Sequence, residues 1–141
     1  MPGSVPLRQR VLAVFDDREA ADRAALAARK VGATVIERHE GSAAADAIDA
    51  TGVKRGMLAR VGRAVQFSVE DQMPALAWYE AALRDGRVVL AIPTRTREQT
   101  QAVVAALRAG GGHFINRFGR LETEEFSRWR GPEPDISSLL K

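Results

Sequence analysis

Four side chains in two apolar stretches of the chain could together bind an anion. Arg38 and His39 end the first stretch, and His113 and Arg117 lie in the second. A shift of 79 positions places Arg38 on Arg117, so the two guanidinium groups occupy matching places. A guanidinium group binds a carboxylate or phosphate through two parallel hydrogen bonds. Arg38, His39, His113 and Arg117 are therefore candidate binding residues for a small anionic ligand.

The same residues also fit a structural interpretation, which the pattern favours. Arg38 and Arg117 are then exposed strand residues paired with local acids, and the histidines are half-exposed polar residues. The spacings His-x-His and His-Glu-x-x-His, typical of metal sites, do not occur in the sequence. No serine stands in a Gly-x-Ser-x-Gly motif, and the glycines 110–112 follow an expected helix instead of opening one. We expect no catalytic residue, no metal site and no cofactor.

An acidic pair, Asp16 and Asp17, follows the first apolar stretch. Such a pair binds magnesium in response-regulator receiver domains, which also need a further aspartate and a lysine after later strands. The chain has no lysine between Lys54 and Lys141. At a strand-to-helix junction, an aspartate side chain accepts hydrogen bonds from the free N–H groups of the first helical turn. We therefore expect the pair to cap a helix.

The candidate residues belong to two segments with the same order of elements. Residues 11–39 fit an apolar strand, an alanine-rich helix and a second strand over 33–39. Residues 88–118 repeat this order, and a shift of 79 positions places Gly32 on Gly111. The first strands of the two units align with a shift of 78. These matches predict two related β-α-β units that arose by internal duplication.

Two β-α-β units predict an α+β fold with a ferredoxin-like sheet, and an open parallel α/β sheet is the alternative. The whole chain is expected to form a single domain, since domains commonly comprise about 100–150 residues. Residues 1–9 are expected to form a loose leader and residues 119–141 a tail. Residues 40–87 form an insertion between the two units. Within the insertion we expect one strand or a hairpin over 57–69 and a helix over 70–84.

Composition narrows the class of protein and of partner. Of the 141 residues, 45% are hydrophobic and 28% are charged, which is typical of globular domains. The absence of cysteine excludes disulfides and thiolate chemistry. The net charge of +3 comes from arginines dispersed among acids, so we expect no nucleic-acid partner. No apolar run approaches the about 18 residues of a spanning helix, and we expect a cytoplasmic protein without a membrane partner.

Both faces of the two innermost expected strands, 11–15 and 88–92, are apolar. The helices of the two units would cover only one face of a four-stranded sheet, which leaves the other face open. An open apolar face usually marks an interface, and a twofold dimer is the commonest way to bury it. We therefore expect a homodimer. The rival cover for this face is the insertion, 40–87.

Three stretches of the sequence resemble the bacterial general-stress-protein type of domain. They are the strand end and acidic pair over 11–17, the helix end over 78–86 with its Trp-Tyr-Glu-Ala-Ala-Leu, and the strand over 112–120. The resemblance covers about residues 11–126. Many relatives of this type carry a glycine-rich helical insertion in the middle, whereas residues 40–70 here are short and mostly polar. The resemblance implies a stress-associated intracellular protein and transfers no catalytic residue.

Three functions are compatible with these patterns. The leading hypothesis is a non-enzymatic interaction or regulatory domain. The alternative is a sensor that binds a small anionic metabolite in a pocket or at a dimer interface, which requires converging polar groups. The third hypothesis is an enzyme whose catalytic motif is not recognisable. Such an enzyme requires an acid or base with a shifted pKa.

Overall fold

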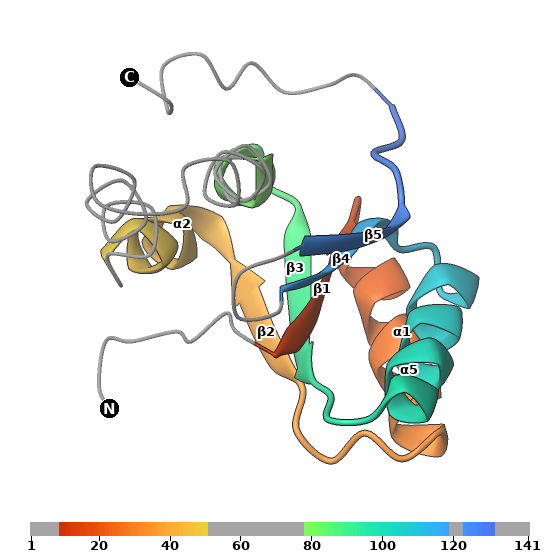
Figure 1. The fold of residues 1–141 in the computed structure, drawn as a ribbon. Helices are drawn as coiled ribbons and strands as arrows, with labels where there is room; N and C mark the ends of the chain where they lie inside the picture. Colours follow the sequence, from red (N-terminus) through yellow and green to blue (C-terminus); the bar gives the residue numbers. More distant parts are fainter. Residues whose placement is uncertain (1–8, 51–77, 119–122, 132–141) are drawn as a thin grey trace, which may run out of the picture.

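The protein has an α+β architecture around one five-stranded antiparallel sheet (Figure 1). The computed structural model describes residues 9–50, 78–118 and 123–131. The strand order is β2-β3-β1-β4-β5, so β1 lies at the centre. All four strand pairs are antiparallel, and the alternative of an open parallel sheet is therefore wrong. The strands are β1 Arg10–Phe15, β2 Glu37–Glu40, β3 Val88–Pro93, β4 His113–Phe118 and β5 Thr123–Ser127.

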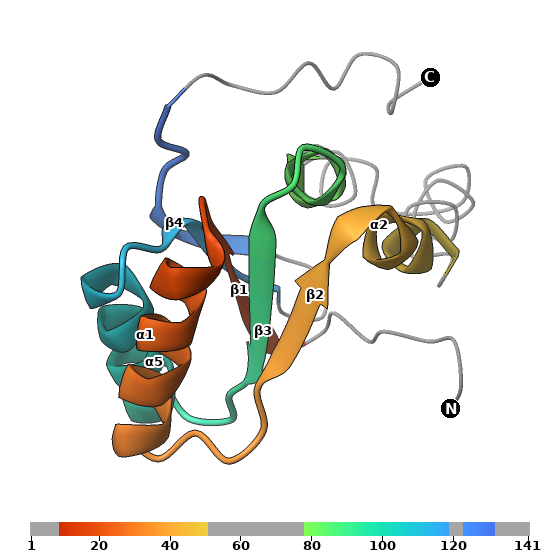
Figure 2. The same cartoon turned by 180° about the vertical axis from the view of Figure 1, so that it is seen from behind.

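Helices lie on both sides of this sheet. α1 (Arg18–Lys30) and α5 (Arg97–Ala109) lie next to each other on one face (Figure 1). α2 (Gly41–Ala50) and a helix over residues 78–84 lie on the opposite side, as the reverse view in Figure 2 shows. The sequence predicts a helix over 70–84, of which the structure describes only the last part. The sheet is thus a middle layer between two helical layers.

Alternation along the central strands creates two separate cores. In β1, Val11, Ala13 and Phe15 pack against α1 and α5, whereas Leu12 and Val14 pack on the other side. β3 divides its side chains in the same way, and all five residues from 11 to 15 are fully buried. Successive side chains of a strand point to opposite faces. The predicted two-sided apolar character of these strands is confirmed.

Small residues let α1 and α5 pack closely. The inner side of α1 consists of alanines, of which Ala24 lies at the crossing with α5. A Cβ atom added to Gly110 would lie 2.6 Å from the Cβ of Ala24, which is closer than such atoms approach. Gly110 is therefore more than the helix stop that the sequence predicts. It also sets the separation of the two helices.

On the other face, the hydroxyl group of Tyr79 joins the helix 78–84 to two strands. It lies 3.0 Å from the carbonyl oxygen of Leu12 and 2.7 Å from that of Phe114, and it accepts a hydrogen bond from the side chain of Asn116. The β1–β4 register shifts at this point, and Phe114 has a φ of 48°. Burial raises the pKa of Tyr79 far above its usual value, so the group stays a neutral hydrogen-bonding residue.

The helix 78–84 and α2 cover the sheet face opposite α1 and α5, which the sequence analysis expects to be uncovered by the two units. Tyr79, Ala82, Leu83 and Ala45 are buried in one cluster with the second-face residues of β1, β3 and β4. Described residues of the insertion thus cover this face, which is the rival possibility that the sequence offered. The expected homodimer stays a prediction, but this face is not free to carry it.

The structure departs from the sequence-based expectations at both edges of the sheet. A strand is expected over 33–39, but β2 comprises only Glu37–Glu40, and the side chain of Val35 before it is 51% exposed. The expected tail, 119–141, contains β5, which pairs with β4. β5 has a single large apolar residue, Phe126, so it carries little hydrophobic signal. The expected strand or hairpin over 57–69 lies outside the described residues.

Asp16 and Asp17 have different roles. The side chain of Asp17 accepts a hydrogen bond of 2.8 Å from the backbone N–H of Ala20, which is N-cap geometry. The predicted cap is confirmed for Asp17. It is wrong for Asp16, whose carboxylate instead bonds to His113 and Arg87.

The cap predicts a measurable stability loss. Asp17→Ala should lower the free energy of unfolding by about 1 kcal/mol, because an N–H group of the first turn loses its acceptor. Asp17→Asn is the matched control, since asparagine is an equally good N-cap residue and should change little. Urea unfolding measures both. Equal losses in the two variants would contradict the cap.

The Tyr79 hydroxyl predicts a larger loss. Tyr79→Phe leaves the buried carbonyl oxygens of Leu12 and Phe114 without this donor, which should cost about 1–3 kcal/mol in the free energy of unfolding. Gln101→Ala, on the exposed side of α5, is the control and should stay within about 0.5 kcal/mol of the wild type. An unchanged free energy of unfolding in Tyr79→Phe would refute this role of the hydroxyl group.

Candidate functional site

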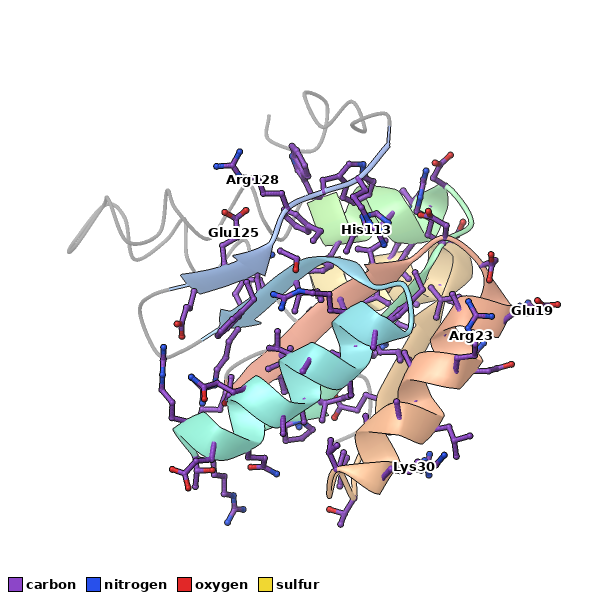
Figure 3. The ribbon with its side chains drawn as sticks, turned by 90° about the vertical axis from the view of Figure 1, so that its right-hand side faces the viewer. Glu19, Arg23, Lys30, His113, Glu125 and Arg128 are labelled. Atoms are coloured by element: carbon purple, nitrogen blue, oxygen red, sulfur yellow. The ribbon has the colours of Figure 1, made fainter. Side chains whose placement is uncertain are left out.

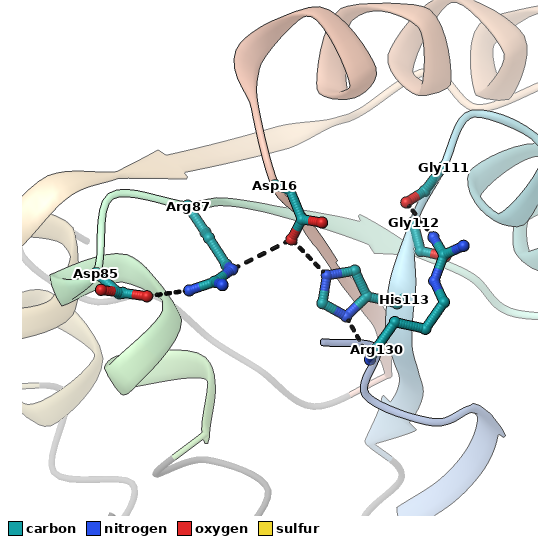
Figure 4. Close-up of polar contacts among 7 residues, drawn as sticks. All are labelled: Asp16, Asp85, Arg87, Gly111, Gly112, His113 and Arg130. Carbon is teal, nitrogen blue, oxygen red and sulfur yellow. Dashed lines mark hydrogen bonds and ion pairs between the residues drawn. The ribbon is translucent and has the colours of Figure 1, made fainter. Parts of the chain in front are cut away.

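A polar cluster forms where three strands meet at one end of the sheet. β1 ends at Phe15, which pairs with Val88 at the start of β3, and Val14 pairs with His113 at the start of β4. The antiparallel register therefore brings together Asp16, which follows β1, and Arg87, which precedes β3. Figure 4 shows these two side chains converging with His113.

Asp16 is the common partner in this cluster. Its Oδ1 atom lies 2.8 Å from Nε2 of His113 and accepts a hydrogen bond of 3.1 Å from Nε of Arg87. Arg87 also donates to the carboxylate of Asp85. The side chain of Asp16 is 63% exposed, whereas that of His113 is 1% exposed. The cluster thus consists of a buried imidazole ring that is hydrogen-bonded to a solvent-exposed carboxylate.

The hydrogen bonds define the tautomer of His113. The backbone N–H of Arg130 donates to Nδ1 of the ring over 3.1 Å (Figure 4). Nδ1 must therefore carry a lone pair, and in the neutral ring the proton lies on Nε2 and is donated to Asp16. Both ring nitrogens are occupied. His113 accordingly lacks a free nitrogen with which to accept a proton from a substrate.

Trp129 packs against this cluster from the segment that follows β5. Its ring meets that of His113 edge-on at 5.0 Å between centroids, and the guanidinium carbon of Arg87 lies 5.4 Å from the Trp129 ring centre. Trp129 also contacts Trp78 and Phe114 edge-on. The aromatic rings thus continue from the polar cluster to the helix 78–84.

The charge of Asp16 is stabilised by its partners. Partial burial raises the pKa of its carboxyl group, but the hydrogen bonds and charges of His113 and Arg87 outweigh burial and hold the pKa below its usual value. Asp16 is therefore ionised at neutral pH. Such a carboxylate can accept hydrogen bonds or pair with a cation, but it is a weak base and carries no proton to donate.

The structure places the predicted ligand residue Arg38 in an ion-pair network on the α1 side of β2. Its guanidinium group binds Asp22 of α1 at 2.6 Å and Glu40 at 2.7 Å, and Glu40 also binds Arg18. The hydrogen bond from Arg38, with the charges of both arginines, lowers the pKa of Glu40 below its usual value against a small opposing effect of burial. Arg38 is thus paired with local acids, as the structural interpretation predicts.

His39, the next residue, lies on the opposite face of β2. It is half-buried opposite Val89, and its Nε2 atom has no hydrogen-bond partner. Burial lowers the pKa of the His39 ring, a nearby Glu37 raises it and Arg10 lowers it, with a net decrease. His39 is therefore neutral at physiological pH.

Arg117 lies on β4 and binds the loop before α5. Its Nε and Nη2 atoms donate to the side-chain oxygen and the carbonyl oxygen of Thr94, each over 3.1 Å. The Thr94 hydroxyl is in turn bonded to Thr100 of α5. Arg117 thus joins β4 to the start of a helix through threonine oxygens.

The four predicted ligand residues do not converge. Arg38 and Arg117 lie on strands that β3 and β1 separate, and Arg38 and His39 point to opposite faces. Of the four, only His113 belongs to the polar cluster. Sequence reasoning did not assign Arg87 or Arg130 to a site. The sequence signals for the cluster were His113, assigned to a ligand site, and Asp16, assigned to a helix cap.

Comparisons of the chain with family models, with curated proteins and with solved structures gave no match. Among the described residues, no group of three or more His, Asp or Glu side chains is arranged to hold a metal ion. No helix in the described ranges is long and apolar enough to cross a membrane.

The lowered pKa of Asp16 predicts a pH-dependent stability difference. Asp16→Asn keeps the acceptor oxygen but removes the charge, so it should lower the free energy of unfolding by up to about 1 kcal/mol, a small value because the group is exposed. The difference should be fully present above the ordinary aspartate pKa of about 3.9 and disappear as the pH falls through the lower pKa of the folded state. Urea unfolding at several pH values measures it.

Salt provides the control for this prediction. Because an exposed ion pair is screened, about 1 M NaCl should reduce the difference between wild type and Asp16→Asn. A difference that grows as the pH falls below 4 would contradict the proposed charge stabilisation.

Proposed function

We propose that this chain is a non-enzymatic interaction or regulatory domain that binds an acidic partner protein. The observation that carries this proposal is the position of the exposed large apolar side chains. In the described part of the chain there are three, Leu26, Val31 and Val35, exposed by 56%, 45% and 51%. All lie within ten residues, in the second half of α1 and the loop after it. Scattered exposed apolar residues are ordinary, whereas a local group indicates an interface.

Basic residues surround this group. We call Arg23, Leu26, Arg29, Lys30, Val31 and Val35 the apolar–basic surface. Arg23, Leu26 and Lys30 follow one side of α1 at helical spacing, and Figure 3 shows Arg23 and Lys30 on its outer side. These cations can therefore meet a partner together with Leu26.

The charge of this surface indicates the partner. Residues 23–36 contain three basic residues and no acid. Two acids of the neighbouring ion-pair network, Asp22 and Glu40, are already bound: Asp22 to Arg38, and Glu40 to Arg18 and Arg38. An excess of positive charge next to aliphatic side chains complements an acidic surface with apolar side chains of its own.

The polar cluster supports the non-enzymatic part of the proposal. Both nitrogens of His113 are hydrogen-bonded within the fold, and the pKa of Asp16 is lowered, away from the range that suits a general acid or base near pH 7. The sensor alternative requires converging anion-binding groups, but Arg38 and Arg117 lie apart and are each bonded within the fold.

Site-specific photo-crosslinking in living cells tests the proposed surface. A photoreactive amino acid replaces Leu26 in the full chain, and the control chain carries it at Gln101 on the exposed side of α5. Position 26 should give discrete crosslinked species with acidic proteins, and position 101 should not. Arg29→Glu with Lys30→Glu should reduce the crosslinked species about tenfold, as expected for losing about 1.4 kcal/mol of charge interaction. Far-UV circular dichroism checks that the reversed chain is folded.

Two results would contradict this surface. One is the same crosslinking pattern at positions 26 and 101. The other is a crosslinked species at position 26 that persists unchanged after charge reversal in the folded chain.

The homodimer expected from the sequence also remains a proposal. Because the second sheet face is covered by the chain itself, the dimer requires a different contact surface. The apolar–basic surface is the best candidate among the described residues, although a face-to-face pair would bring the cations of Arg23, Arg29 and Lys30 together. Like charges that meet across an interface are unfavourable. A dimer in sedimentation velocity that dissociates in Leu26→Glu would support this contact, and a monomer at every concentration would refute self-association.

We further propose that the core is a ferredoxin-like unit produced by duplication, with β5 added at the edge. The order β2-β3-β1-β4 with α1 and α5 on one face supports the first part. The N-cap residues Asp17 and Thr96 are 79 positions apart, as are Gly32 and Gly111, which both have positive φ. These matches support the origin of the unit by duplication. The resemblance of the sequence to general-stress-protein domains supports a stress-associated role.

A further inference from the structure

We infer that His113 is a pH-sensitive latch that holds residues 128–131 against the end of the sheet. This inference is independent of the apolar–basic surface. It concerns the opposite end of α1, where the polar cluster lies, and a segment that the sequence assigned to a tail. Figure 3 shows His113 and Arg128 well away from Lys30.

Backbone and side-chain hydrogen bonds attach this segment to the sheet. The carbonyl oxygen of Arg128 accepts a hydrogen bond from the N–H of Phe114, and the side chain of Arg130 donates to the carbonyl oxygen of Gly111. Another bond runs from the backbone N–H of Arg130 to Nδ1 of His113 (Figure 4). Between them, the Trp129 ring packs edge-on against the imidazole. His113 is thus a titratable anchor whose bond requires the neutral form of the ring.

Protonation removes this anchor. The neutral ring accepts through Nδ1, whereas the imidazolium ion has N–H donors at both nitrogens and no acceptor. In the charged form, Nδ1–H faces the N–H of Arg130, and two donors cannot bond to each other. Gain of one proton at Nδ1 therefore breaks the contact between His113 and the backbone of Arg130.

The charged groups around the ring decide how readily it is protonated. From the β1–α1 junction, Asp16 stabilises the imidazolium ion through Nε2. Arg87, before β3, opposes it and is itself partly neutralised by Asp85. Arg130, on the segment, is a further positive charge, and its side chain donates to the carbonyl oxygen of Gly111. The His113 ring is 1% exposed. Asp16 is the acidic group in direct contact with it, at 2.8 Å from Nε2.

Opening of the latch would expose aromatic surface. Trp129 contacts His113, Trp78 and Phe114, and Trp78 stacks on Phe114 at 5.0 Å between centroids. When the segment leaves, one side of this cluster loses its cover, and Arg87 loses the ring beside it. The chain would present an aromatic patch at low pH that it buries at neutral pH.

Trp129 itself reports on the latch. The full chain contains two tryptophans, so Trp78→Phe leaves Trp129 as the only one. Acrylamide quenching of its fluorescence, measured from pH 8 to pH 5, should increase in a single step. Far-UV circular dichroism should stay constant over the same range. In the same background, His113→Gln should remove the step, because glutamine offers an acceptor and a donor that do not titrate.

The chain provides a matched control, since its only other histidine is His39. His39→Gln should leave the step unchanged. Asp16→Asn should move the midpoint of the step to lower pH, because the imidazolium ion loses its counter-charge. This variant keeps the test decisive if His113→Gln does not fold.

Three results would overturn the latch. They are quenching that does not change between pH 8 and 5, a step that persists in folded His113→Gln, and a step that His39→Gln removes. A midpoint that Asp16→Asn leaves in place would also contradict it.

Discussion

The Tyr79 hydroxyl group lies where β1 and β4 lose their regular pairing, and the arrangement of one end of the molecule depends on it. At the register shift, the carbonyl oxygens of Leu12 and Phe114 lie within hydrogen-bonding distance of the Tyr79 hydroxyl group. The side chain of Asn116 donates a hydrogen bond to the same hydroxyl group. Phe114 can then hold a φ of 48° and direct its ring toward Trp78. Buried carbonyl groups need partners, so the irregular strand and the helix 78–84 stabilise each other.

The same irregularity positions the polar cluster. His113 precedes the shifted residue and lies beside the end of β1, within hydrogen-bonding distance of Asp16. α1 starts at Asp17, immediately after this carboxylate, and ends at Lys30 beside the apolar–basic surface. One helix thus separates two regions with different chemistry. One is the hydrogen-bonded cluster of Asp16, Arg87 and His113, and the other is the exposed apolar–basic surface.

Sequence reasoning succeeded where a periodic pattern determines the structure. The two-sided burial of 11–15 and the cap at Asp17 follow from local residue types, and both are confirmed. It failed at β5, a polar edge strand with little hydrophobic signal. It also failed for Arg38 and Arg117, because positions that match under a shift of 79 are not thereby neighbours in space: two strands separate them. The partners of Asp16 come from residues 71 and 97 positions away, and a single sequence offers no local signal for such contacts.

Thiol labelling tests most directly whether the helix 78–84 covers the second face of the sheet, since the chain has no cysteine of its own. Ala13→Cys would report on the face under α1 and α5, and Ala91→Cys on the face under the helix 78–84; both alanines are fully buried. At low protein concentration, the two cysteines should react equally slowly, and much more slowly than an exposed Leu26→Cys. Reaction of Ala91→Cys as fast as Leu26→Cys, while Ala13→Cys stays protected, would contradict this account.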